Sequence, residues 1–290
     1  MESIRESKLF NLIKKDTLRT SIELAIEFVK EIWDSDRLLT NFTDHTIKHN
    51  FKVLEIIEKM PNICKVNYLD EKEIYVLIMG IFLHDIGMQC DIRIRSNVKE
   101  EAERIFNVKF SQTYSNNKGT QLTIKQQKEI RDNHSLITAA WISILYYEKF
   151  HIPERMVEDI IDVCKYHSKL NIEDCPRNFK NHTRCRKKLI ATILRLGDEL
   201  DISYDRDRIG KVKESSIPEK SKIYWYIYYI TDVEIDSNSI KIQYRINPEE
   251  CKENIDYIER IFQNKKLDTP HNKRLCGYFD FQNIAIQMNK

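Results

Sequence analysis

The stretch Phe82-Leu83-His84-Asp85-Ile86-Gly87-Met88 places a histidine and an aspartate side by side at the end of an apolar run that begins at Ile74. The run predicts a buried helix. A carboxylate that is buried without a partner is costly, so Asp85 needs a positive charge beside it. An arginine such as Arg93 or Arg95 can supply that charge, and so can a metal ion. The rest of the chain is needed to distinguish these two explanations.

The composition indicates a globular protein with few helix-breaking residues. The chain has 290 residues, of which 41% are hydrophobic and 32% charged, enough for one large domain or one domain with an appendage. Glycine and proline occur only six times each, which favours long helices. The net charge of +2 gives no support to nucleic-acid binding.

Three further patterns bear on the compartment. The first residues carry no signal-peptide pattern. No apolar run approaches the roughly 20 residues that a membrane span needs. The seven cysteines are scattered and form no CxxC motif, which is typical of free thiols in a reducing cytosol. We therefore expect a cytoplasmic protein that has no membrane partner.

The first two-thirds of the chain predicts one helix after another. Apolar residues recur at helical spacing, and capping residues or proline mark several of the ends. The expected helices cover about 18–34, 43–60 after a Thr43-Asp44 cap, 70–87 after an Asp70 cap, 122–149, 153–168 from Pro153, and 183–202. Between residues 90 and 123 the pattern weakens, so we expect either an ordinary surface loop or a lid beside the His84-Asp85 pair.

The pattern changes after Gly210. Residues 222–230 are β-branched and aromatic, residues 236–239 form a turn signal, and residues 240–246 alternate, which together predict a β-hairpin. Residues 248–264 then have a helical pattern. We expect a mainly α fold, with a helical domain over 1–210 and a small α+β appendage, a β-hairpin plus a helix, over 211–290.

Five of the eight histidines fall inside predicted helical segments. These are His45, His49, His84, His134 and His167. Asp198, in the stretch LRLGDELD, has the same burial problem as Asp85. Each residue alone has a structural explanation: a helical histidine can be hydrogen-bonded in the core, and Asp198 can pair with Arg195. Their order on successive helices favours one shared centre.

That order resembles the HD superfamily of metal-dependent phosphohydrolases. The similarity covers about residues 40–205 and rests on TDHTIKHNFKV (43–53), LHDIG (83–87) and LRLGD (194–198). His134 and His167 extend it toward the ligand order of the HD-GYP phosphodiesterases, but the tandem His-His and the GYP tripeptide are missing. The cyclic-dinucleotide substrate of that subgroup is therefore not carried over. The flanks and the β-rich tail are similar to HD domains of bacterial conflict and signalling proteins.

The resemblance implies an HD-domain helical bundle with two metal sites. The first metal is expected on His49, His84, Asp85 and Asp198, and Asp85 bridges to a second metal held with His134 and His167. Such mixed nitrogen and oxygen ligands suit Mn²⁺, Fe²⁺, Co²⁺, Ni²⁺ or Zn²⁺ better than Mg²⁺ or Ca²⁺. Two ions about 3.5–4 Å apart can activate water for attack on a phosphoryl group.

One more histidine and four basic residues complete the expected site. We assign Asp85 and His45 as catalytic. His45 lies one turn before His49, where it can be an outer ligand, a proton donor to the leaving oxygen, or a structural residue. Four basic residues lie within four positions of expected ligands and can contact phosphate or form salt bridges with neighbouring helices. They are Lys48, Arg131, Lys165 and Arg195.

Three functions are compatible with these residues. The leading hypothesis is hydrolysis of a phosphoester or phosphoanhydride in a small, nucleotide-like substrate by metal-activated water. The first alternative is a catalytically silent nucleotide-sensing module that signals through the aromatic hairpin at 222–246, which can also be the edge of a homo-oligomer. The second is an HD-type nuclease, which the near-zero net charge disfavours.

Overall fold

The computed structural model describes residues 3–35, 38–40, 45–60, 62–65, 68–111, 121–176 and 185–201, and the backbone of 231–235 and 240–244. The described residues are mainly helical. Their α-helices are α1 (Lys8–Leu12), α2 (Asp16–Asp34), α3 (Ile47–Lys59), α4 (Glu71–Leu83), α5 (Ser96–Phe106), α6 (Ile124–Leu145), α7 (Glu154–Tyr166) and α8 (Lys187–Leu200). Short 3-10 helices cover Ile4–Glu6, Ile86–Gln89 and Ile172–Asp174, and two strands, β1 (Thr231–Ile235) and β2 (Ile240–Tyr244), follow.

The chain divides into two compact units. The first consists of residues 1–40, 45–51 and 69–195, and the second of residues 41–44, 52–68 and 196–290. The division falls inside two continuous helices: α3 and α8 each begin in the first unit and end in the second. Five of the six predicted metal ligands belong to the first unit, and Asp198 lies in the last turn of α8.

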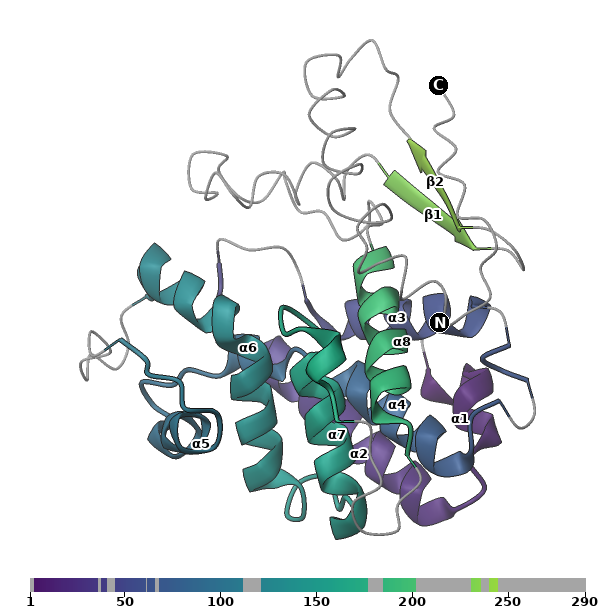
Figure 1. Cartoon of the computed structure of the whole chain (residues 1–290), viewed down its shortest axis with the longest axis horizontal. Helices are drawn as coiled ribbons and strands as arrows, with labels where there is room; N and C mark the ends of the chain where they lie inside the picture. The colour runs from purple at the N-terminus through teal and green to yellow at the C-terminus, as the bar shows by residue number, and fades with distance from the viewer. Residues whose placement is uncertain are drawn as a thin grey trace. The chain divides into compact units, whose positions relative to one another are not determined.

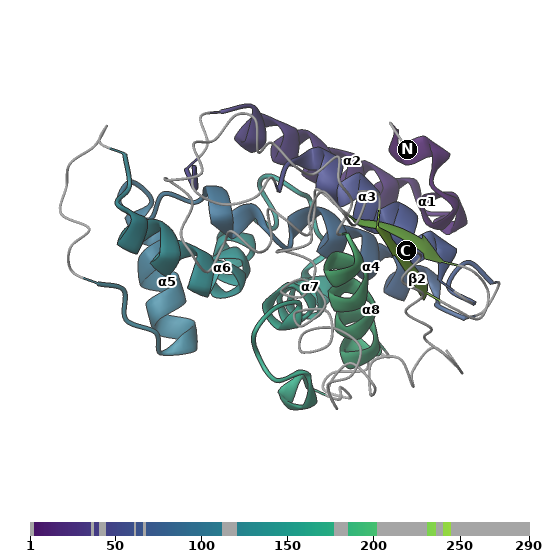
Figure 2. The ribbon, with the colours of Figure 1, turned by 90° about the horizontal axis from the view of Figure 1, so that it is seen from above.

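Helix α4 forms the centre of the first unit. Every residue from Glu73 to Leu83 is buried, as expected of a helix that is apolar all around. It contacts α1, α2 and α7, and it lies between α2 and α7 (Figure 2). Helix α6 packs beside α7 and also contacts α5 and the 3-10 helix after Asp85 (Figure 1). The His84-Asp85 pair, at the end of α4, thus lies next to α6.

The helix starts follow from local chemistry. The Asp70 side chain accepts from the Glu73 amide at 2.8 Å, and Glu73 accepts from the Asp70 amide at 3.2 Å, which confirms the predicted cap of α4 as a reciprocal capping box. Thr123 and Gln126 form the same arrangement at the start of α6. Pro153 precedes the first residue of α7, as its fixed backbone angle favours.

Two predictions in the first unit were wrong in detail. The helix expected to end near Gly87 ends at Leu83, and the chain turns at His84-Asp85 before a 3-10 helix begins. The segment expected to be a loop between 90 and 123 contains α5, whose buried residues are only Val98 and Ala102. So few apolar positions give a weak periodic signal. Residues 112–120 lie outside the described part, so the lid hypothesis stays a prediction.

The second unit contains the remainder of α3, the last turn of α8 and the strands. A Cβ at Gly197 would lie 2.6 Å from Ile57 Cγ1, so the close packing of α8 on α3 requires glycine there. The strands pair antiparallel, from Thr231 with Tyr244 to Ile235 with Ile240, which agrees with the predicted hairpin in its second strand. Residues 222–230, the turn at 236–239, the helix at 248–264 and the boundary at 210 lie outside the described residues.

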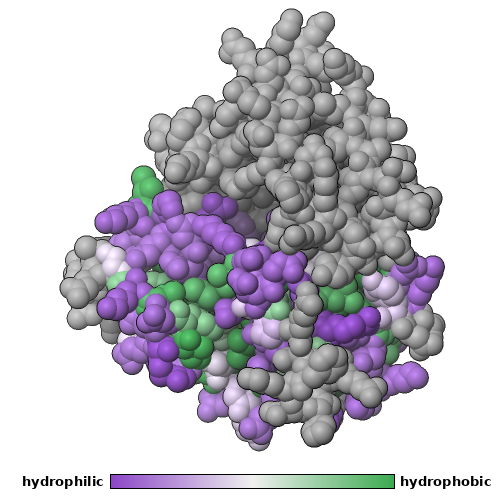
Figure 3. Space-filling model, viewed as in Figure 1, coloured by the Kyte–Doolittle hydropathy of each residue, from purple (hydrophilic) through white to green (hydrophobic). Residues whose placement is uncertain are grey.

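The visible face of the helices is mostly polar, with small apolar areas between the polar ones (Figure 3). Among the described residues, no helix has both the length and the apolar character that crossing a bilayer requires.

Candidate metal centre

Five buried histidines meet around one buried carboxylate. His49 lies in the first turn of α3, His84 caps α4, and Asp85 follows it. His134 lies in the middle of α6 and His167 caps α7. His45, just before α3, is buried as well. Asp85 is only 3% exposed, so its charge is compensated inside the protein or not at all.

The two oxygens of Asp85 face different histidines. Oδ2 lies 3.2 Å from His84 Nε2, 3.8 Å from His49 Nε2 and 3.9 Å from His45 Nε2. Oδ1 lies 3.2 Å from His134 Nε2 and 3.4 Å from His167 Nε2. The cluster therefore has a first half, with His49 and His84, and a second half, with His134 and His167. Asp85 belongs to both halves.

The imidazole rings form a continuous arc around Asp85. Consecutive rings meet edge to face, with centroids 5.6 Å apart for His45 and His49 and 5.3 Å for His49 and His84. The arc continues at 4.8 Å from His84 to His167 and at 5.0 Å from His167 to His134. Helices distant in the sequence thus present their imidazoles to one point.

Backbone carbonyls fix the orientation of three of these rings. His84 Nδ1 donates to the Ile81 carbonyl at 2.8 Å, and His134 Nδ1 donates to the Arg131 carbonyl at 2.6 Å. His167 Nδ1 donates to the Cys164 carbonyl. Each acceptor lies three residues earlier in the chain. With the proton on Nδ1, a neutral ring presents the Nε2 lone pair to Asp85, which is the arrangement found in metal-ligating histidines.

Burial and the neighbouring groups set the charge states of Asp85 and His167. Burial lowers the pKa of His167 to about 4, against a smaller opposing effect of Asp85, so this ring is neutral at pH 7. Burial alone would raise the pKa of Asp85, but the charge that His84 can carry and the imidazoles of His134 and His167 hold it well below its usual range. The centre therefore combines an ionised carboxylate with at least one neutral imidazole.

Two observations show that these side chains are suited to hold a metal ion. His49 Nε2 faces His84 Nε2 at 3.2 Å, and His134 Nε2 faces His167 Nε2 at 3.0 Å. Facing lone pairs at these distances repel unless a proton or a cation lies between them. Asp85 Oδ1, moreover, is buried and accepts no hydrogen bond of good geometry from any of the described residues. A cation in each half would satisfy the facing nitrogens and this oxygen together.

The potential ligand atoms form two groups. His49, His84, Asp85 and Asp198 place one ligand atom each within 4.8 Å of one another, and so do Asp85, His134 and His167. These are the same two sets that the resemblance to the HD superfamily implies. Both combine imidazole nitrogen with carboxylate oxygen and contain no cysteine, a chemistry that suits divalent transition metals.

Two supporting residues were not predicted from the sequence. Asn50 Nδ2 donates at 2.6 Å to the Ile81 carbonyl, the same oxygen that orients His84. Thr138 Oγ1 donates to the His84 carbonyl at 2.9 Å. Their position beside His49 and one turn after His134 was the only available signal, and it does not reveal which backbone groups they reach.

The predicted substrate-binding residues have varied surroundings. Lys48 is exposed and Arg131 is half-buried. Lys165 Nζ lies 5.1 Å from the Phe106 ring centroid and 5.0 Å from that of Tyr166. Arg195 is buried and donates to the His167 carbonyl at 3.2 Å and to the Leu170 carbonyl at 2.6 Å. Arg195 thus binds the backbone at the C-terminal end of α7, where His167 lies.

The arginines proposed as alternative partners of Asp85 have other contacts. Arg93 Nη2 lies 2.7 Å from Asp91 Oδ2, and the Arg95 guanidinium lies 4.7 Å from the centroid of the Trp141 ring. The imidazoles, by contrast, surround both oxygens of Asp85. The geometry therefore favours the metal explanation of the buried carboxylate.

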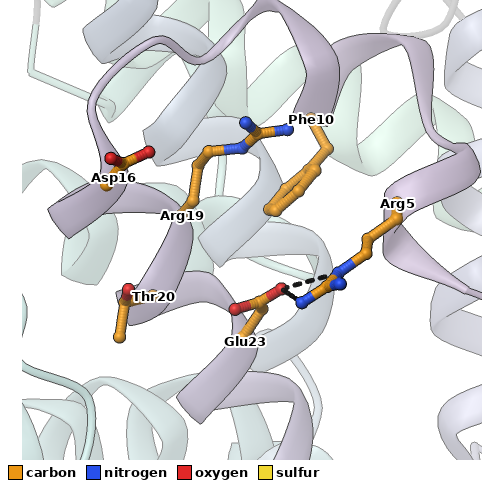
Figure 4. A pocket seen from close by; sticks show the side chains of 6 residues that line it. All are labelled: Arg5, Phe10, Asp16, Arg19, Thr20 and Glu23. Atoms are coloured by element: carbon orange, nitrogen blue, oxygen red, sulfur yellow. Dashed lines mark hydrogen bonds and ion pairs between the residues drawn. The ribbon is translucent and has the colours of Figure 1, made fainter.

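A separate hollow of about 380 Å³ lies between the first residues and α2 (Figure 4). Its arginines are engaged: Arg5 pairs with Glu23 at 3.2 Å, and the Arg19 guanidinium lies 4.7 Å from the Phe10 ring centroid. None of the residues that line it is a predicted site residue. They are Arg5, Phe10, Asp16, Arg19, Thr20 and Glu23.

Comparisons with known proteins agree with this geometry. The model of the HD-CE family, a family of HD domains, matches residues 39–269. Searches of curated proteins and of solved structures gave no match. The matched region contains all the residues of both ligand groups and covers most of the chain. The chain therefore belongs to the HD-CE family.

Proposed function

We propose that this protein is a metal-dependent phosphohydrolase that cleaves a phosphoester or phosphoanhydride bond in a small, nucleotide-like substrate. The observation that carries the proposal is the arc of imidazoles around Asp85, whose two oxygens face two separate groups of ligands. The phosphorylated substrate class comes from the HD-domain resemblance.

His49, His84, Asp85 and Asp198 would hold one divalent ion, and Asp85, His134 and His167 a second. Mn²⁺, Fe²⁺, Co²⁺, Ni²⁺ and Zn²⁺ all suit these ligands. Bound ions of this kind supply a nucleophile at neutral pH by lowering the pKa of water, and they stabilise charge on a phosphoryl oxygen. The carbonyls behind His84, His134 and His167 keep the rings oriented for this role.

Residues around the cluster have distinct roles in this proposal. His45 lies 3.9 Å from Asp85 and is outside both ligand groups, and in this proposal it gives a proton to the leaving oxygen. Lys48 and Arg131 provide positive charge near the ligands for the phosphate. Lys165 and Arg195 add to the same positive charge. Lys165 also lies against aromatic rings, and Arg195 also holds the carbonyls that follow α7.

The test combines metal analysis with a substrate screen. Purified protein is analysed for transition metals and then incubated with Mn²⁺ and nucleoside triphosphates, cyclic nucleotides or a generic phosphodiester. We expect bound metal and metal-dependent phosphate or alcohol release. Asp85→Asn should lose both. Asp162→Asn is the matched control, since Asp162 is a buried carboxylate that pairs with Lys187 instead of the cluster.

Other outcomes would identify the alternatives. Tight nucleotide binding without turnover, unchanged by Asp85→Asn, would support the silent sensing module. Metal-dependent cleavage of labelled single-stranded DNA or RNA, with no action on small substrates, would support the nuclease. Wild-type protein without bound metal and without metal-dependent turnover contradicts the proposed function.

A further inference from the structure

Thr138 joins the two halves of the centre through the backbone. It lies one helical turn after His134 on α6 and is fully buried. Its hydroxyl donates to the His84 carbonyl at 2.9 Å and accepts from the Gly87 amide at 2.9 Å. The same side chain therefore binds the backbone on both sides of Asp85.

The turn and the helix are also in direct contact at Gly87. A Cβ at this position would lie 2.2 Å from the His134 carbonyl oxygen and 2.8 Å from the Thr138 amide nitrogen, so only glycine allows the approach. Gly87 permits the contact, and the Thr138 hydroxyl sets its register. If the Thr138 hydroxyl were removed, the His84 carbonyl at the end of α4 and the Gly87 amide would each lose a hydrogen bond in a buried position.

We propose that Thr138 is a positioning residue that fixes the spacing between the two halves of the metal centre, an inference that rests on the proposed function. Asp85 is two residues from Gly87 and adjacent to His84, so the Thr138 bonds hold its backbone from both ends. His134 lies on the same helix as Thr138, and its Nε2 lies 3.2 Å from Asp85 Oδ1. A shift of the turn along α6 changes this distance directly. The second group has three potential ligands and the first has four, so the second would be the first to lose its ion.

The experiment measures metal binding in four variants without any substrate. Thr138→Val keeps the side-chain volume but removes both hydrogen bonds, and Thr138→Ser keeps the hydroxyl. Thr192→Val is the matched control, because Thr192 is equally buried and donates to the Lys188 carbonyl within its own helix. Thr138→Ala replaces the valine variant if circular dichroism shows that the latter does not fold.

Binding is followed by titration with Mn²⁺ or Co²⁺ and by metal content after gel filtration. Of the two ions, we expect Thr138→Val to bind the more weakly held one about 10- to 100-fold less tightly. This is the usual effect of losing a group that orients metal ligands. Thr138→Ser should restore binding, and Thr192→Val should match the wild type even if its thermal midpoint falls. A purely structural role would lower the midpoint in both valine variants and leave metal affinity unchanged.

The outcomes separate this inference from the proposed function. Wild-type protein that binds no transition metal overturns both. Wild-type protein that binds two ions, together with a Thr138→Val variant of unchanged affinity, overturns the role of Thr138 alone. Loss of the weaker ion in Thr192→Val, or failure of Thr138→Ser to restore it, overturns that role as well.

Discussion

At the scale of single residues, the two halves of the centre should respond differently to substitution. His167 belongs only to the second half, whereas Asp85 belongs to both. We predict that His167→Gln retains one ion per chain and that Asp85→Asn retains none, because Asp85 is the residue that the two groups share. Metal content per chain after dialysis checks the prediction. Equal losses in the two variants would mean that the groups do not act as separate sites.

His45 should affect turnover more than metal binding. Its Nε2 lies 3.9 Å from Asp85 Oδ2, near the centre but outside both ligand groups. If His45 protonates the leaving oxygen, His45→Gln should lower kcat by about 10²–10⁴-fold, the usual range for a general acid. Metal content should stay the same, and the rate loss should shrink with a substrate whose leaving group needs no proton. A substitution that removes metal instead would make His45 an outer ligand.

At the scale of elements, the start of α4 was easier to predict than its end. Asp70 and Glu73 lie at the spacing of a capping box, and the structure has that box at α4. The end of α4 at Leu83 was missed because the apolar pattern continues through Ile86, although the chain already turns at His84-Asp85. Ligand geometry at this turn depends on Thr138, which is distant in sequence, so no local pattern reports it.

The capping box of α4 also predicts a pH effect on stability. Glu73 is 2% exposed and accepts hydrogen bonds from the Arg186 backbone amide and side chain. Burial would raise the pKa of Glu73, but the bonds from Arg186 and Asp70 bring it below its ordinary value of 4.5. A carboxyl group whose folded pKa is lowered stabilises the protein above its unfolded pKa, and this contribution disappears as pH falls through the folded value.

We therefore expect Glu73→Gln to reduce the free energy of unfolding by about 1.5–3 kcal/mol at pH 7, the range for buried charged hydrogen bonds. The glutamine keeps the cap, so the helix itself should remain. Urea unfolding at pH 7 and at successive steps below pH 4.5 measures the difference between variant and wild type. That difference should narrow as the wild-type carboxylate becomes protonated. A difference that stays constant at every pH would contradict the ion pair between Glu73 and Arg186.

At the scale of the whole molecule, the order of ligands along the chain was predictable and their arrangement was not. The six expected ligands could be selected because their order on separate predicted helices resembles that of the HD superfamily; they are His49, His84, Asp85, His134, His167 and Asp198. The arc of rings around one carboxylate depends on how α3, α4, α6 and α7 pack. Lys187 shows the same limit: its place in the basic run Arg186-Lys187-Lys188 gives no sign of burial, yet it is fully buried and pairs with Asp162.

Ligands from several separate helices couple metal binding to folding. The unfolded chain has no preformed site, so an ion that binds the native state stabilises it by mass action. At a free metal concentration of about 100 times Kd, the free energy of unfolding should rise by about 2.7 kcal/mol per site relative to chelator-treated protein. Urea unfolding with and without Mn²⁺ or Zn²⁺ measures this gain.

Comparing different ions, and comparing Asp85→Asn with wild type, shows whether the stabilising ions bind at the metal centre. Ca²⁺ prefers sites made only of oxygen ligands, so it should raise the unfolding midpoint much less than Mn²⁺ or Zn²⁺. Asp85→Asn should lose the gain for every ion, since both groups share that carboxylate, while Asp162→Asn should keep it. If Mn²⁺ or Zn²⁺ stabilised Asp85→Asn as much as wild type, the ions would bind elsewhere on the chain. The imidazole arc would then need protons, and not metal, to balance its facing nitrogens.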